Sequence, residues 1–141
     1  MLRGLTTVTF YADDVTAAKD WYSDVLGIEA YFVRPVEGPP AYVEFRIGDY
    51  QHELGILDSR FTPHGRSEKA CGAVIYWHVD DIDAAVGRLV SLGATVHDKP
   101  VERGPGFVTA SVVDPFGNIL GVMYNRHYLE VVESTAAGGV T

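Results

Sequence analysis

The chain has 141 residues, the size of one domain that can bury a hydrophobic core of its own. Its 19 acidic and 11 basic residues give a formal net charge of -8, which repels nucleic acid backbones and anionic lipid surfaces. The single cysteine, Cys71, excludes an internal disulfide. The first residues resemble neither a signal peptide nor a membrane span. We therefore expect a cytoplasmic protein with no nucleic acid partner and no membrane partner.

The sequence contains an internal repeat. The Asp-Asp-Val triplet at 13–15 recurs as Asp-Asp-Ile at 80–82, 67 residues later, and the Leu-Gly pair at 26–27 recurs at 92–93. Each copy begins with a short run of β-branched and aromatic residues, passes two aspartates and continues as an amphipathic run that ends at glycine. This order predicts a strand, an N-capped helix and a helix end. The predicted helices cover 15–26 and 82–92.

The first copy, residues 5–58, contains three further predicted strands. One covers 29–34, and two form a hairpin with arms at 41–47 and 51–57 around a Gly-Asp-Tyr turn. Alternation gives each strand one apolar face, which meets the helix, and one polar face. The residues predicted on the polar face are Thr7, Thr9, Tyr11, Tyr42, Glu44, Arg46 and Glu53.

A linker at 59–72, rich in turn-forming and charged residues, leads to the second copy at 73–125. This copy repeats the plan with a first strand at 74–78, a short strand at 95–98 and a hairpin with arms at 107–113 and 119–124. Its polar face is predicted to hold Tyr76, His78, Thr109 and Ser111. The single domain is expected to cover 1–133, and the small residues at 134–141 to form a flexible tail.

The order of these motifs, together with Asp-Pro-Phe-Gly-Asn-Ile-Leu-Gly-Val at 114–122, resembles the vicinal oxygen chelate superfamily. This group includes glyoxalase I, bleomycin-resistance proteins and extradiol dioxygenases. The resemblance covers residues 5–125. It implies an α+β fold in which two β-α-β-β-β modules form a curled mixed sheet, with a concave cavity and with helices on the convex face. Because such modules leave sheet edges exposed, we also expect a homodimer.

The enzymes of this superfamily hold a divalent metal at four positions. Carried over residue by residue, these positions are Thr7, Glu53, Val74 and Gly121. Valine and glycine side chains offer no ligand atom, and a threonine hydroxyl is a poor donor, so a lone carboxylate at Glu53 would hold a metal weakly. We therefore expect no metal ligands and no cofactor.

The polar faces instead predict a site for a small molecule that is cationic or aromatic, because they combine tyrosines with two glutamates. The predicted ligand-binding residues are Thr7, Thr9, Tyr11, Tyr42, Glu44, Arg46, Glu53, Tyr76, His78, Thr109 and Ser111. Each also has a structural interpretation: His78 as a hydrogen-bonded wall residue, Glu44 and Arg46 as an ion pair, and the tyrosines as packing.

Three hypotheses for the function follow. We favour a metal-free binding protein that sequesters an antibiotic or a metabolite. The alternative is a lyase, isomerase or dioxygenase of the same superfamily, which uses His78 and Glu53 as acid and base or a metal site at other positions. The third is a scaffold that only dimerises.

Overall fold

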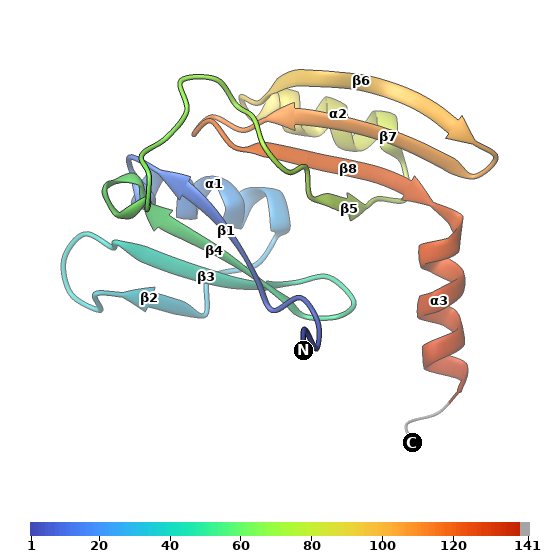
Figure 1. Cartoon of the computed structure of the whole chain (residues 1–141), viewed down its shortest axis with the longest axis horizontal. Helices are drawn as coiled ribbons and strands as arrows, with labels where there is room; N and C mark the ends of the chain where they lie inside the picture. Colours follow the sequence, from blue (N-terminus) through green and yellow to red (C-terminus); the bar gives the residue numbers. More distant parts are fainter. Residues whose placement is uncertain (139–141) are drawn as a thin grey trace. The chain divides into compact units, whose positions relative to one another are not determined.

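The computed structural model describes residues 1–138 and divides the chain into two compact units. The first unit contains residues 1–69 and the short segment 116–118, and the second contains residues 70–115 and the chain from 119 onward. The division after Lys69 falls in the predicted linker. Each unit has one four-stranded sheet (Figure 1) and is described by itself.

The first unit has the sheet order β1-β4-β3-β2, in which β1 is parallel to β4 and the other pairs are antiparallel. Its elements are β1 (Thr7–Ala12), α1 (Val15–Leu26), β2 (Phe32–Arg34), β3 (Tyr42–Ile47), β4 (His52–Asp58) and the short 3-10 helix η1 (Ser59–Phe61).

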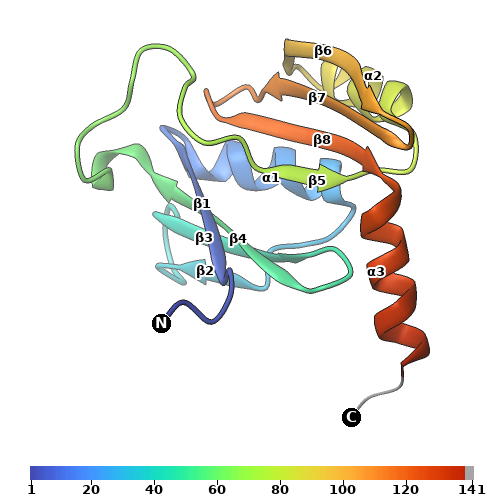
Figure 2. The ribbon, with the colours of Figure 1, turned by 45° about the vertical axis from the view of Figure 1, so that its right-hand side comes forward.

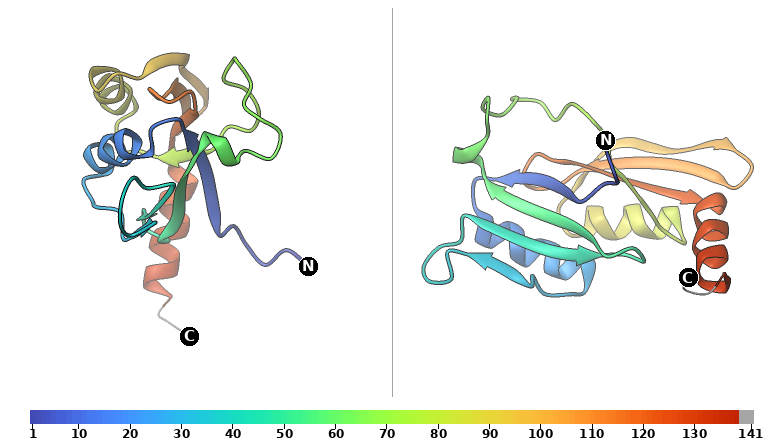
Figure 3. Two further views of the ribbon diagram at one scale, coloured as in Figure 1. Left: turned by 90° about the vertical axis from the view of Figure 1, so that its left-hand side faces the viewer. Right: turned by 60° about the horizontal axis from the view of Figure 1, so that its bottom comes forward.

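Helix α1 covers one face of this sheet (Figure 3). The Asp14 side chain caps it by accepting a hydrogen bond from the Ala17 backbone N–H at 3.0 Å, and Gly27 ends it in the left-handed conformation, with φ of 68°. The predicted bounds of this helix are confirmed. Its buried residues face buried strand side chains, and the core of the unit contains Phe10, Ala12, Val15, Ala18, Tyr22, Val43, Phe45, Ile47, Leu54 and Ile56.

The second unit repeats this plan. Its sheet has the order β5-β8-β7-β6, with β5 parallel to β8. The elements are β5 (Tyr76–His78), α2 (Ile82–Ser91), β6 (Thr95–Gly104), β7 (Phe107–Val113), β8 (Ile119–Asn125) and α3 (Arg126–Ala137). The predicted α+β fold with two β-α-β-β-β modules is therefore confirmed, as two separate four-stranded mixed sheets that are not closed.

Strand β6 is longer than predicted, because it continues past Asp98 to Gly104. It is the edge strand of its sheet, all but its last residue is exposed, and its pairing with β7 is interrupted by three register shifts. An exposed edge strand needs no apolar alternation, and Pro100 is tolerated where no partner strand requires its N–H. The pattern that predicts buried strands therefore does not detect it.

Helix α3 corrects the expectation of a flexible tail from residue 134, because residues 134–137 form its last turn. It follows β8 directly (Figure 2) and is capped by the Asn125 side chain, which accepts a hydrogen bond from the His127 backbone N–H at 3.0 Å. Residues 139–141 of the predicted tail lie outside the described residues. No helix within residues 1–138 is long and apolar enough to cross a membrane.

The turn residue Asn118 belongs to the first unit, although it lies between two strands of the second sheet in the sequence. Its amide oxygen accepts from the Tyr11 backbone N–H at 3.1 Å, and its amide nitrogen donates to the Tyr11 carbonyl at 2.8 Å. The side chain thus satisfies both backbone groups of one β1 residue, as a neighbouring strand would.

Candidate functional site

The face of the first sheet that points away from α1, here called the first open face, carries the predicted polar residues in cross-strand rows. Thr7 pairs with Glu53, which pairs with Arg46; Thr9 pairs with Gly55, which pairs with Glu44. A third row joins Tyr11, Leu57, Tyr42 and Arg34. Neighbours in one row have their side chains on the same side of the sheet. Seven of the predicted residues therefore share one face.

Glu53 is the centre of an ion-pair and hydrogen-bond network on this face. Its Oε2 atom accepts from the Thr7 hydroxyl at 2.5 Å, and its Oε1 atom lies 3.2 Å from an Arg46 guanidinium nitrogen. The Arg46 guanidinium also lies 4.9 Å from the centre of the Tyr31 ring. The Glu53 side chain is therefore fixed in place by groups on both neighbouring strands.

A second polar pair on this face consists of Tyr42 and Glu44 of β3. The Tyr42 hydroxyl donates a hydrogen bond of 2.5 Å to Glu44 Oε1. Burial raises the pKa of the Glu44 carboxyl above its ordinary value, and the charge of Glu53 raises it further, whereas Arg46 lowers it. Burial and Glu53 also raise the pKa of Tyr42. Both groups thus retain their protons more strongly than free side chains do.

Gly55 makes room for this pair. A Cβ atom at Gly55 would lie 2.5 Å from the Tyr42 hydroxyl oxygen and 2.8 Å from its ring. The ring therefore rests on bare backbone, which only glycine provides. Phe32 contacts the same ring edge-on, with the centroids 6.1 Å apart, and adds a second aromatic group to the face.

The corresponding face of the second sheet, the second open face, carries the remaining predicted residues in two rows. Tyr76 pairs with Gly121, which pairs with Ser111; His78 pairs with Met123, which pairs with Thr109. Tyr76 is 38% exposed, whereas Ser111 is fully buried and its hydroxyl has no hydrogen-bond partner within residues 1–138. The Thr109 hydroxyl accepts from Arg103 Nε at 3.1 Å. Asp98 of the edge strand β6 pairs with Ser111 and continues the first of these rows.

His78 has a partner at each ring nitrogen. Its Nδ1 accepts from the Asn125 backbone N–H at 3.2 Å, and its Nε2 lies 3.3 Å from Asp80 Oδ1. Because Nδ1 accepts, the ring proton of the neutral form is on Nε2. The ring also stacks on Tyr128 of α3, with the centroids 4.9 Å apart and the planes at 10°. These contacts favour the structural interpretation of His78 over that of a general base.

The strand register revises one of the four metal positions that the resemblance implied. Thr9 and Tyr76 are equivalent in the repeat; Thr9 pairs with Gly55 and Tyr76 pairs with Gly121. The counterpart of Gly121 is therefore Gly55, and Glu53 lies two residues away from it. With Thr7, Val74, Gly55 and Gly121 at the four positions, the residues present do not fit a divalent metal.

The tyrosine rings also fill the space at both glycines. A Cβ at Gly121 would lie 2.7 Å from the Ile75 carbonyl oxygen, 2.8 Å from the Tyr76 ring and 2.9 Å from Val74. Within residues 1–138, no three His, Cys, Asp or Glu side chains are grouped so that they could hold a metal ion. The sequence contains a signal for this equivalence, because Leu-Gly-Ile at 54–56 matches Leu-Gly-Val at 120–122.

Comparison with known proteins agrees with this architecture. The sequence profile of the Glyoxalase/Bleomycin resistance protein/Dioxygenase superfamily matches residues 4–122. The chain belongs to this superfamily. No curated protein matches the sequence significantly.

Solved structures with the same fold include proteins with different names. A lactoylglutathione lyase from Agrobacterium tumefaciens is 23% identical, with 87% of this chain and 94% of that chain covered and a TM-score of 0.63. TioX from Micromonospora sp. ML1 is 17% identical, with 86% and 98% covered and a TM-score of 0.65. A superfamily member from Sphaerobacter thermophilus is 22% identical, with 86% and 97% covered and a TM-score of 0.67. At these identities the similarity shows the fold alone.

Proposed function

We propose that this member of the superfamily is a metal-independent binding protein for a small organic molecule. The observation that carries the proposal is the first open face, where the hydrogen-bonded pair of Tyr42 and Glu44 lies near the charge of Glu53 and beside the aromatic rings of Phe32 and Tyr31. A few directed polar groups beside aromatic walls are the usual composition of a small-molecule site. Sequestration of an antibiotic or a metabolite would need no more than this.

The charges on this face favour a ligand with a cationic group. Two carboxyl groups, Glu44 and Glu53, share one arginine, Arg46, as their neighbouring cation. A protonated amine placed near both carboxyl groups would relieve their mutual repulsion. It would also make cation–π contacts with the neighbouring rings. The formal net charge of -8 attracts such a ligand from solution.

Titration calorimetry tests this proposal with small aromatic amines and, as matched controls, uncharged analogues with the same ring. We expect the amines to bind and the uncharged analogues to bind more weakly. Glu53→Gln should weaken amine binding by about 1 to 2 kcal/mol, because a charge-assisted hydrogen bond is replaced by a neutral one. His64→Ala, in an exposed loop, should have no effect. Binding that is equal for amines and analogues, or unchanged in Glu53→Gln, would contradict the proposal.

A separate variant tests whether the second open face takes part in ligand binding. If Tyr76 contributes to the ligand site, Tyr76→Ala should weaken binding by about 1 to 3 kcal/mol through lost apolar contact. Unchanged binding in Tyr76→Ala would restrict the site to the first open face.

A lyase or isomerase activity is the second candidate, and one observation favours it. Glu44, with a raised pKa and a hydrogen bond from Tyr42, is a carboxyl group that can hold and release a proton on an open face. It is better suited to this role than Glu53, whose two oxygens already have partners, or His78. Loss of turnover with retained binding in Glu44→Gln would favour the enzyme over the binding protein.

A further inference from the structure

A cationic side chain of the protein itself lies among the groups of the first open face. One nitrogen of the Arg46 guanidinium lies 3.2 Å from Glu53 Oε1, and another donates to the Gln51 carbonyl at 3.3 Å. The same guanidinium lies 4.9 Å from the centre of the Tyr31 ring. A carboxylate, a carbonyl and an aromatic ring around one flat cation are the groups that bind a guanidinium ligand.

The Arg46 side chain is held loosely in this position. It is 46% exposed to solvent. Its contacts with Glu53 and with the Gln51 carbonyl, at 3.2 and 3.3 Å, are longer than the about 2.7 to 2.9 Å of a strong charge-assisted hydrogen bond. Exposed ion pairs contribute little to stability, because water solvates both charges when they separate. Moving the Arg46 side chain aside therefore costs little free energy.

The groups around the Arg46 guanidinium have anchors of their own. The Thr7 hydroxyl donates to Glu53 Oε2, and only 21% of the Glu53 side chain is exposed. The Tyr31 backbone N–H donates to the Glu44 carbonyl at 3.1 Å, which attaches this part of the chain to β3. The carboxylate and the ring therefore stay in place when the Arg46 side chain leaves.

We infer that Arg46 is a tethered substitute for the ligand, and that the ligand of the first open face carries a guanidinium or amidinium group that displaces it. The inference rests on the proposed function and names the ligand class for the same site. It also changes the role of Arg46, which the sequence places among the ligand-binding residues. Arg46 is a built-in competitor of the ligand and determines how tightly the site binds.

The flat shape of the group distinguishes this ligand class from simple amines. A guanidinium is planar, so it can stack on Tyr31 while its nitrogens donate to Glu53 and to the Gln51 carbonyl. An ammonium is a compact, strongly hydrated charge without a flat face. Both cations pair with Glu53, but the flat one gains the ring and carbonyl contacts in addition.

The tether sets the strength of the competition. Arg46 and Glu53 are direct partners on the paired strands β3 and β4, so the guanidinium is always within reach of the carboxylate. A group on a short flexible tether competes like a free molecule at about millimolar concentration. Removal of the tethered cation should therefore strengthen the binding of a free one.

Calorimetric titration tests the inference with three molecules that share one ring: benzylguanidine, benzylamine and the uncharged benzylurea. We expect Arg46→Met to bind benzylguanidine about fivefold more tightly than the wild type, the size expected when an exposed ion pair no longer competes. Arg46→Lys keeps a tethered cation and should bind benzylguanidine as the wild type does. Benzylamine should gain less than benzylguanidine in Arg46→Met, and benzylurea should bind weakly to every variant.

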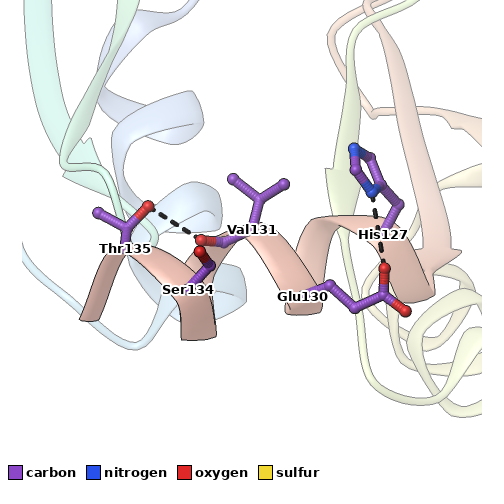
Figure 4. A pocket seen from close by; sticks show the side chains of 5 residues that line it. All are labelled: His127, Glu130, Val131, Ser134 and Thr135. Atoms are coloured by element: carbon purple, nitrogen blue, oxygen red, sulfur yellow. Dashed lines mark hydrogen bonds and ion pairs between the residues drawn. The ribbon is translucent and has the colours of Figure 1, made fainter. Parts of the chain in front are cut away.

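Helix α3 offers a matched control. Figure 4 shows its groove, where Glu130 contacts His127, and Arg126 Nε lies 3.7 Å from the same Glu130 carboxylate. This pair has the same charges as Arg46 and Glu53, but its side chains are more exposed, at 64% and 62%. Arg126→Met therefore changes the net charge as Arg46→Met does and should leave the affinity for benzylguanidine unchanged.

A second measurement follows the displaced side chain itself. NMR spectra resolve arginine Nε–H groups, and the Arg46 signal is the one that Arg46→Met lacks. We expect benzylguanidine to move this signal in the wild type to the position of a solvated arginine. The double variant Arg46→Met/Glu53→Gln should lose the fivefold gain, because the carboxylate that both cations share is then absent.

Two outcomes would overturn the inference. One is unchanged or weaker binding of benzylguanidine by Arg46→Met, which would make Arg46 a bystander or a ligand contact. The other is an equal gain for benzylamine, which would remove the preference for a flat cation. Both leave the proposed function intact where the wild type binds these cations. A failure of both cations to bind the wild type and Arg46→Met would overturn the proposed function together with this inference.

Discussion

The two open faces have the same backbone plan but different chemistry. On the first, a charged row of Thr7, Glu53 and Arg46 crosses three strands. On the second, the corresponding strands present Tyr76, Gly121 and a buried Ser111. The repeat thus preserves what the backbone requires, such as helix caps and strand pairing, and leaves the open face free to vary. The candidate ligand chemistry therefore belongs to the first copy more than to the second.

The two glycines, Gly55 and Gly121, sharpen this comparison. Both occupy the same register position, and both lie beneath a tyrosine ring. Their surroundings differ in stiffness. At Gly55 the atom nearest to an added Cβ is the hydroxyl oxygen at the end of the Tyr42 side chain, whereas at Gly121 it is the backbone oxygen of Ile75. A side chain tip can move aside, whereas a strand carbonyl cannot.

The largest predicted effect follows from this difference. We expect Gly121→Ala to lower the free energy of unfolding by about 3 kcal/mol and Gly55→Ala by about 1 kcal/mol, since overpacking against backbone is the more costly. Urea denaturation of both variants measures the difference. Equal losses would mean that the two positions are equivalent in packing as well as in register. Gly55→Ala should nevertheless impair ligand binding, because it displaces Tyr42.

The second prediction concerns the charge on the first open face. The pKa of Glu44 is raised above its ordinary value of 4.5, so the folded state holds this proton more tightly than the unfolded state does. The resulting stabilisation is fully present below pH 4.5 and is lost as the pH rises through the higher folded-state pKa.

Glutamine cannot titrate, so Glu44→Gln removes this pH dependence. We expect the stability of Glu44→Gln relative to the wild type to increase between pH 4 and pH 7, as measured by urea denaturation at each pH. Glu37→Gln, in an exposed loop, controls for the change in net charge. A relative stability that falls over this range would contradict the assigned direction of the pKa shift.

The smallest effects compare one hydroxyl from each face. Thr7→Val removes a hydrogen bond to a carboxylate and should cost about 0.5 to 1 kcal/mol. Ser111→Ala removes a buried hydroxyl without a partner within residues 1–138, so it should be neutral or stabilise the fold by a few tenths of a kcal/mol. Thermal denaturation of the two variants side by side is the measurement. Destabilisation by Ser111→Ala beyond that of Thr7→Val would show that this hydroxyl has a partner in solution.

The sequence by itself determined the elements whose signals are local. Asp14 and Gly27 bound α1 because capping needs only neighbouring backbone groups, and Asp81 does the same for α2. Alternation placed Thr7, Thr9 and Tyr11 on the open face because successive strand side chains point to opposite sides. The repeat predicted the order of elements along the chain, which is a strand, a helix and three further strands in each copy.

Tertiary structure decided what depends on register between distant segments. Strand pairing establishes that Gly55, and not Glu53, is the counterpart of Gly121, because a shift of two residues leaves the alternation of faces along the strand unchanged. The contacts that His78 makes with Asn125 of β8 and with Tyr128 of α3 join segments that are far apart in the sequence. The pairing of Tyr42 with Glu44 depended on the space above Gly55, which no local sequence pattern describes.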